Sequence, residues 1–183
     1  MQASLLLYAP LVFVNVWHAI VILLARKMKR PWGSISESAV ASSTLLTVHK
    51  AIHVIGAICF FMYGLWLFST QAMPLVAAVL CITSLFDCVQ VMALNARTDH
   101  TPLNIRDHHQ LLAWLMAISD LAFCILFAVG KQVALPILFA FLCILGITTL
   151  WLKVTKFRYF WLAQMIFFVS GSVMIVIAAR HGV

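Results

Sequence analysis

The sequence predicts an all-α, polytopic integral membrane protein with six transmembrane helices and with both termini on the outer side of the membrane. Of its 183 residues, 64% are hydrophobic and only 9% are charged, whereas about 25% of the residues in a soluble domain are charged. The mean hydropathy is +1.08. A soluble domain of this length has too much surface to bury so many apolar side chains. The composition therefore excludes a soluble enzyme and a DNA-binding module, even though the net charge is +7.

Six apolar runs are long enough to cross a bilayer, which requires about 20 residues per helix. The runs lack the alternation of a barrel strand, and backbone groups must be paired in lipid, so each run is predicted to be a helix. The first run is too long for a signal-peptide core and no basic residue precedes it, so it is expected to remain in the mature protein. All six belong to one transmembrane domain, residues 1–183. The predicted spans are 5–25, 48–69, 72–95, 111–130, 133–152 and 160–179.

Lysine and arginine are distributed unequally between the two sides of this predicted bundle. Ten of the twelve lie in or beside the loops 26–47, 96–110 and 153–159. The remaining two, Lys131 and Arg180, lie on the other side. Because basic loops stay on the cytoplasmic side, the asymmetry predicts that these three loops are cytoplasmic and that the protein resides in the cytoplasmic (inner) membrane.

The first cytoplasmic loop contains a helix start signal. Ser34 and Glu37 have the spacing of a capping box, in which each residue satisfies a backbone donor of the other. Residues 31–47 are therefore expected to form either an interfacial helix that leads into the second span or an irregular loop.

The second cytoplasmic loop, residues 96–110, is the most polar stretch of the chain. Asp107 is a candidate N-cap for a helix that contains His108 and His109. The same stretch is a candidate docking surface for a membrane partner.

The most informative residues are ionisable side chains that hydrocarbon would normally exclude. At a rise of about 1.5 Å per residue, His18, His53, Asp87 and Asp120 lie about 6–15 Å inside the cytoplasmic boundary. An Asp that faced lipid would cost about 2.5–3.5 kcal/mol, so the helix faces that carry these residues are expected to converge. His49, one helical turn before His53, lies at the mouth of the predicted site.

One hypothesis for this cluster is a metal or haem site that acts on a small or lipid-soluble substrate. An i, i+4 histidine pair can give two imidazoles to one metal, and carboxylate and further imidazole ligands would suit zinc or iron. For haem b, His18 and His53 are candidate axial ligands from neighbouring helices. The candidate metal ligands are His49, His53, Asp87, His108 and His109.

Two other hypotheses remain open, and the sequence favours the metal or haem site over them only narrowly. In a proton-coupled small-solute transporter or channel, Asp87 and Asp120 would carry protons and His53 would relay them. In a non-catalytic sensor or assembly subunit, the buried polar groups would hold helices together within an oligomer. The sequence leaves undecided whether the protein is an enzyme.

The expected partners are membrane lipids. Tryptophans along or near the span ends, Trp17 among them, are interpreted mainly as anchors at the membrane interface. No pattern for nucleic-acid binding is present, and the basic loops are explained by topology and by anionic headgroups.

Overall fold

The computed structural model describes residues 2–27, 34–71, 73–94, 103–156 and 159–180, with the side chains of 2–4, 103–108 and 110 outside that description. Within these ranges the regular structure is entirely helical, and six helices are long and apolar enough to cross a membrane. The predicted fold class, a polytopic helical membrane protein, is confirmed. The helices are α1 (Gln2–Lys27), α2 (Ile35–Ala39), α3 (Ser43–Ser69), α4 (Pro74–Met92), α5 (Leu103–Gly130), α6 (Leu135–Val154) and α7 (Phe160–Arg180).

Local sequence explains where several helices begin and end. The hydroxyl of Ser42 caps α3 by accepting a hydrogen bond from the amide of Leu45, at 3.1 Å. Proline occupies the first turn of α4 and of α6, where its missing N–H would have no helical partner. The turns after α3, α5 and α6 each contain one residue in the left-handed region, which stops the helical hydrogen-bond pattern. These residues are Gln71, Gln132 and Lys156.

The structure differs from the predicted boundaries most clearly before the fourth span. Helix α5 begins at Leu103 rather than 111, so much of the predicted loop 96–110 is helical. A helix satisfies its own backbone and can continue past the apolar run into a polar region. Asp107 lies inside this helix, and the prediction that it is an N-cap is wrong.

The loop predicted at 31–47 combines its two expected forms. Ser34 caps α2 by accepting a hydrogen bond from the amide of Glu37, at 3.1 Å, as the spacing predicted. The helix does not lead into α3, however, because it ends at Ala39 and Ser42 starts a new helix.

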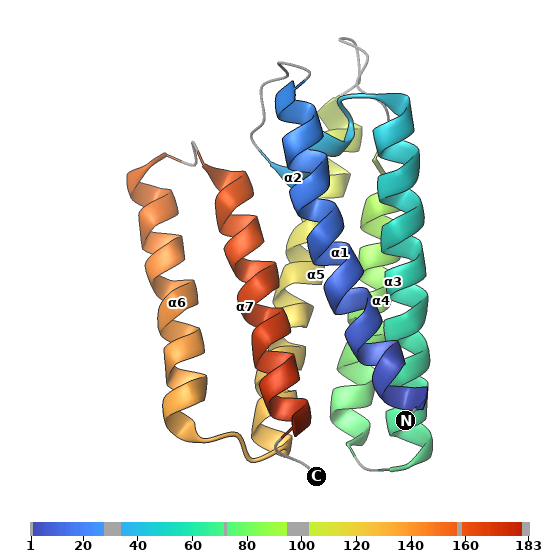
Figure 1. Ribbon diagram of the computed structural model, residues 1–183, viewed down its shortest axis with the longest axis vertical. Helices are drawn as coiled ribbons and strands as arrows, with labels where there is room; N and C mark the ends of the chain where they lie inside the picture. The colour runs from blue at the N-terminus through green and yellow to red at the C-terminus, as the bar shows by residue number, and fades with distance from the viewer. Residues whose placement is uncertain (1, 28–33, 72, 95–102, 157–158, 181–183) are drawn as a thin grey trace.

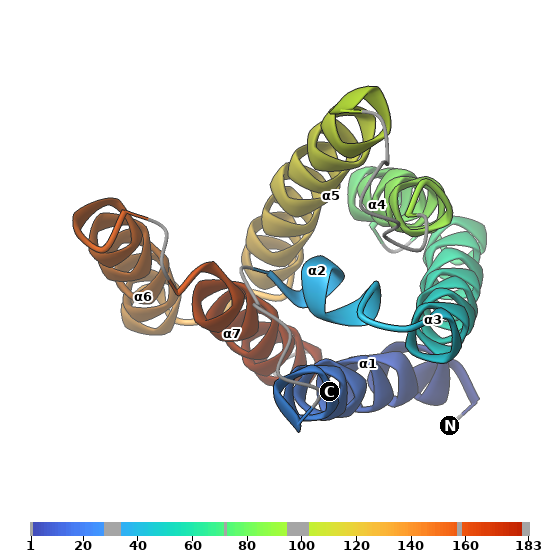
Figure 2. The same cartoon turned by 90° about the horizontal axis from the view of Figure 1, so that it is seen from above.

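Five helices surround a common interior. Figure 2 shows α1, α3, α4, α5 and α7 arranged as a ring, with α2 inside it at one end and α6 outside it against α7. The start of α1 and the end of α7 lie together at the opposite end of the bundle, as an even number of spans requires (Figure 1). We refer to the end that contains α2 as the α2 end.

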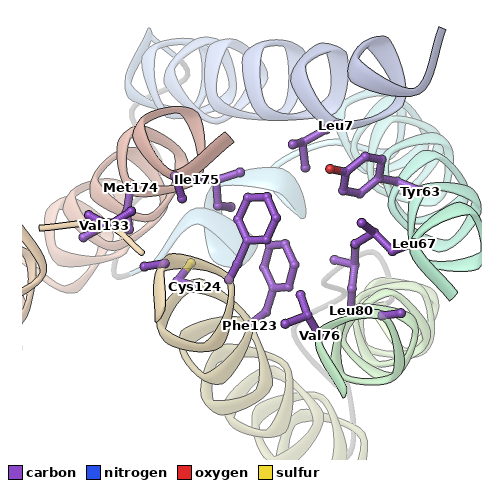
Figure 3. Packing of buried hydrophobic residues seen from close by; sticks show 14 of the residues in the cluster. Leu7, Tyr63, Leu67, Val76, Leu80, Phe123, Cys124, Val133, Met174 and Ile175 are labelled. Carbon is purple, nitrogen blue, oxygen red and sulfur yellow. The ribbon is translucent and has the colours of Figure 1, made fainter. Parts of the chain in front are cut away.

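The interior is divided into two layers. Away from the α2 end, apolar side chains from all five ring helices fill the centre, with Phe123 at its middle (Figure 3). The ring of Phe123 stacks on that of Phe127. Outward faces are also apolar: Leu135 is 79% exposed and Val154 is 81% exposed, which suits contact with lipid. Among the described residues, the buried histidines lie instead in the layer near the α2 end; they are His18, His49, His53 and His109.

Candidate functional site

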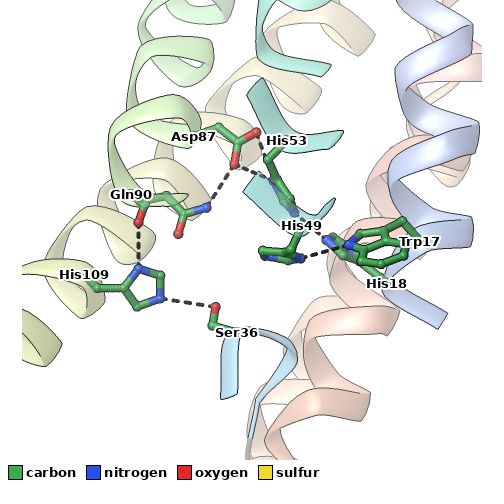
Figure 4. Close-up of polar contacts among 8 residues, drawn as sticks. All are labelled: Trp17, His18, Ser36, His49, His53, Asp87, Gln90 and His109. Atoms are coloured by element: carbon green, nitrogen blue, oxygen red, sulfur yellow. Dashed lines mark hydrogen bonds and ion pairs between the residues drawn. The ribbon is translucent and has the colours of Figure 1, made fainter. Parts of the chain in front are cut away.

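A histidine–aspartate pair joins α3 to α4 in the polar layer. The Nδ1 atom of His53 lies 2.9 Å from Oδ1 and 3.2 Å from Oδ2 of Asp87. A carboxylate accepts hydrogen bonds, so Nδ1 of His53 is the nitrogen that carries the proton. His53 is 4% exposed. The bond therefore fixes the orientation of a buried imidazole whose second nitrogen, Nε2, points away from Asp87 (Figure 4).

That second nitrogen meets another histidine. Nε2 of His53 lies 2.9 Å from Nε2 of His18 on α1, so one of the two atoms donates a proton and the other accepts it. The outer nitrogen of His18, Nδ1, is buried and has no hydrogen-bond partner among the described residues. The three side chains thus form a continuous hydrogen-bonded chain, His18–His53–Asp87, across three helices.

A third histidine packs beside this chain. The ring of His49 lies with its centre 4.4 Å from that of His53 and 6.1 Å from that of His18. Its Nδ1 accepts a hydrogen bond from Nε1 of Trp17 at 3.0 Å, so the proton of a neutral His49 is on Nε2. His49 is 2% exposed. His49 therefore adds a third buried imidazole beside the chain, and the lone pair of its Nδ1 already accepts the bond from Trp17.

The chain continues from Asp87 toward α5 and α2. Gln90 donates to Oδ1 of Asp87 from its Nε2 at 3.0 Å, and its backbone carbonyl accepts from Nδ1 of His109 at 2.9 Å. The other nitrogen of His109 lies 3.2 Å from the hydroxyl oxygen of Ser36. Figure 4 shows this sequence of contacts, which connects α2 with the buried pair through two residues.

The structure brings together some of the predicted site residues and separates others. His18, His53 and Asp87 form one chain, with His49 beside it and His109 at its far end. Asp120 on α5 is half-buried and close enough to Asp87 for their charges to interact, without a described hydrogen bond to it. The side chain of His108 and residues 96–102 of the predicted docking surface lie outside the described parts.

Three contributors were not predicted as site residues. Trp17, interpreted from the sequence as an interface anchor, is 8% exposed and binds His49. Gln90 was recognisable only as a polar residue one helical turn after Asp87. Ser36 lies in a stretch whose fold the sequence left open, so no pattern indicated that it would reach His109.

The geometry of the site can be compared with the haem and the metal ion that the sequence analysis suggested. Nε2 of His18 and Nε2 of His53 lie 2.9 Å apart and are hydrogen-bonded to each other. In this structure the two nitrogens therefore face each other directly, which does not fit a pair of ligands that would hold one haem between them. Within the described ranges, no group of three or more His, Cys, Asp or Glu side chains is arranged to hold a metal ion. His18 and His53 remain as two converging candidate ligands.

Comparisons with family models, curated proteins and solved structures found no match to this chain.

The buried environment of His109 predicts that the folding stability of the protein depends on pH. Burial lowers the pKa of His109 from 6.5, an effect that the neighbouring His53 reinforces and the bond to the Gln90 carbonyl opposes. Below pH 6.5 the unfolded chain protonates His109 more readily than the folded protein does. The contribution of neutral His109 to folding stability is therefore present above pH 6.5 and is lost as the pH falls. An Asn at this position can still donate to the Gln90 carbonyl but does not titrate.

We therefore expect His109→Asn to make the unfolding midpoint in detergent less sensitive to pH between about 5 and 8. The comparison of variant with wild type isolates His109 from the other histidines. The same pH dependence in both proteins would contradict the assignment.

Proposed function

We propose that the protein translocates protons across the membrane, with His53 and Asp87 as the pair that holds the proton in transit. The observation that carries this proposal is the 2.9 Å contact between His53 Nδ1 and Asp87 Oδ1 in the interior of a bundle of membrane-length helices. Ionisable groups at such positions are expensive to bury and mark ion or proton pathways. The bond from His53 onward to His18 supplies a relay rather than an isolated pair.

The hydrogen-bond directions support a stepwise transfer. A proton taken up at Nδ1 of His18 allows the proton on its Nε2 to pass to Nε2 of His53. The proton on Nδ1 of His53 then passes to the carboxylate of Asp87. Each imidazole gains one proton and gives up another, so neither accumulates charge. The chain resets when Asp87 releases its proton and the two rings return to their first tautomers.

Asp120 is the proposed next acceptor. It lies on the neighbouring helix, within electrostatic range of Asp87, and two nearby carboxylates disfavour being ionised together. Protonation of one favours ionisation of the other, so a proton on Asp87 would be exchanged with Asp120. In the proposed orientation the α2 end faces the cytoplasm, because the loops at that end hold most of the basic residues.

Reconstituted vesicles test this proposal without knowledge of a solute. Purified protein is placed in liposomes that contain a pH-sensitive dye, and a potassium diffusion potential drives protons inward. The wild type is expected to acidify the lumen well above the rate of empty liposomes, and His53→Ala is expected to return to that baseline. Wild-type flux equal to that of empty liposomes would refute proton translocation.

A second candidate function is metal binding through His18 and His53. The observation that favours it is the bond from His53 Nδ1 to Asp87, since metal-bound imidazoles commonly donate their other N–H to a carboxylate. Elemental analysis of purified protein is expected to find stoichiometric zinc or iron that both His18→Ala and His53→Ala remove. Protein that folds and transports protons without bound metal would eliminate this candidate.

A further inference from the structure

We propose that α2 is a gate that closes the α2 end of the bundle over the His18–His53–Asp87 chain and opens by swinging about residues 40–42. The proposal extends the proton-translocating function, on which the meaning of the gate rests. In Figure 2, α2 lies within the ring formed by α1, α3, α4, α5 and α7, where it covers the interior of the bundle. Below it, His18, His49 and His53 are 1%, 2% and 4% exposed.

The apolar side of α2 rests on residues that contact the histidines. Ile35 and Ala39 are buried in a cluster that includes Trp17 and also contacts the partly buried Phe168. Trp17 donates to His49, and the ring of Phe168 lies 4.8 Å from that of His18. Removing α2 would therefore uncover the layer that separates these two imidazoles from the α2 end.

Two hydrogen bonds attach α2 to helices that do not adjoin it in sequence. The hydroxyl of Ser36 bonds to Nε2 of His109 on α5, and the amide of Ile35 donates to Oε1 of Gln164 on α7 at 2.8 Å. A five-residue helix is too short to be stable alone, so α2 depends on its contacts with the rest of the bundle, these two bonds among them. Loss of such contacts is therefore expected to release it.

The chain after α2 allows it to move without loss of α3. Ser42 caps α3 with its side chain at the amide of Leu45 and with its carbonyl at the amide of Leu46. These bonds involve no residue of α2. Residues 40–42 therefore form a short connection about which α2 can swing while α3 keeps its first turn.

The gate is coupled to the proton-holding pair through two residues, His109 and Gln90. His109, which binds Ser36, also donates to the carbonyl of Gln90, whose side chain donates to Asp87. Opening α2 removes one of the two contacts that fix His109. The support that His109 gives to Gln90, the residue that donates to Asp87, therefore depends on the state of the gate.

Histidine accessibility tests the gate directly. Diethyl pyrocarbonate modifies exposed imidazoles, and mass spectrometry reports the rate at His18 and His49. In the double variant Ser36→Ala with Gln164→Ala, both rates are expected to rise about tenfold, because two of the bonds that hold α2 closed are lost. Rates equal to those of the wild type would overturn the proposal.

Matched controls lie on the same helices. Among the described residues, the hydroxyls of Ser38 and Ser170 bond to their own segments, at the carbonyls of Ser34 and Phe167, so Ser38→Ala with Ser170→Ala is expected to leave both rates unchanged. Alkylation of Cys124, which is 2% exposed in the apolar layer, reports general unfolding. An equal rise in the control variant, or a rise at the histidines that only accompanies Cys124 labelling, would overturn the gate.

Hydrogen exchange in the wild type provides a test that needs no variant. The amide of Ser38 in α2, that of Val40 at its C-cap, and those of Leu45 and Leu46 in α3 are all hydrogen-bonded at the same end of the protein. If α2 opens separately, the first two are expected to exchange at least about tenfold faster than the second two. Equal rates would overturn independent opening. Neither histidine accessibility nor hydrogen exchange requires proton flux. If α2 opens as proposed but the protein carries no protons, the proposed function is refuted and the gate is not.

Discussion

Replacing Asp87 with Asn is expected to reduce potential-driven proton flux at least about 100-fold, the smaller end of the usual contribution of a positioned acid or base. The substitution keeps the size of the side chain and its place beside His53 and Gln90. In the His18–His53–Asp87 chain, the carboxylate of Asp87 is the group that takes a proton from His53 and later releases it. The amide of Asn cannot carry out this step. The measurement is luminal acidification in the dye-loaded liposomes.

Ser84→Ala is the matched control for this variant. Ser84 lies one helical turn before Asp87 and is equally within the membrane, but its hydroxyl donates to the carbonyl of Leu80 in its own helix, at 2.8 Å. We expect its flux to equal that of the wild type. Full flux in Asp87→Asn, with the variant folded as judged by protection of Cys124, would remove Asp87 from the pathway.

Replacing Gly64 with Leu is expected to destabilise the bundle by about 2–3 kcal/mol through overpacking. A Cβ at this position would lie 2.7 Å from the sulfur of Cys81 and 3.2 Å from the carbonyl oxygen of Ala77. The sulfur can move, but the carbonyl belongs to the backbone of α4, so α3 and α4 must separate. The unfolding free energy is measured by denaturing-detergent titration.

Gly146→Leu makes the same chemical change where space is available. Nothing lies within 4 Å of a Cβ built at Gly146 on α6, so the stability is expected to change by less than about 0.5 kcal/mol. Since both variants alter helix propensity equally, their difference isolates the α3–α4 contact. Equal stability of the two variants would show that α3 and α4 do not pack as closely as described.

Much of the architecture follows from the sequence because apolar length and helix signals act locally. Each predicted span corresponds to a helix, and the fourth begins early because a helix can extend beyond the apolar run that defines it. The Ser34 cap was also predicted correctly, since it involves residues three positions apart. The interior position of α2 was not predictable, because the apolar surface against which it packs is formed by α1, α3 and α7 together.

The candidate site can likewise be divided into features that the sequence predicted and features that it did not. Helical spacing and the expense of burying charge were enough to predict that His18, His53 and Asp87 face a common interior. Which atoms meet depends on the rotation of α1 against α3 and of α3 against α4, and hydrocarbon-facing side chains constrain those rotations only loosely. The pairing of Trp17 with His49 and the distance between the His18 and His53 nitrogens belong to this second category.

By itself, the sequence determined that this protein is a six-span helical bundle and predicted that the histidines and aspartates within its spans lie in one half, because hydrophobic length and periodicity are properties of each segment alone. Only the tertiary structure decided that His18, His53 and Asp87 form one hydrogen-bonded chain and that α2 covers it. The physical reason is that hydrogen bonds form only within about 3 Å and along particular directions. Those conditions depend on how separate helices pack, which no single segment encodes.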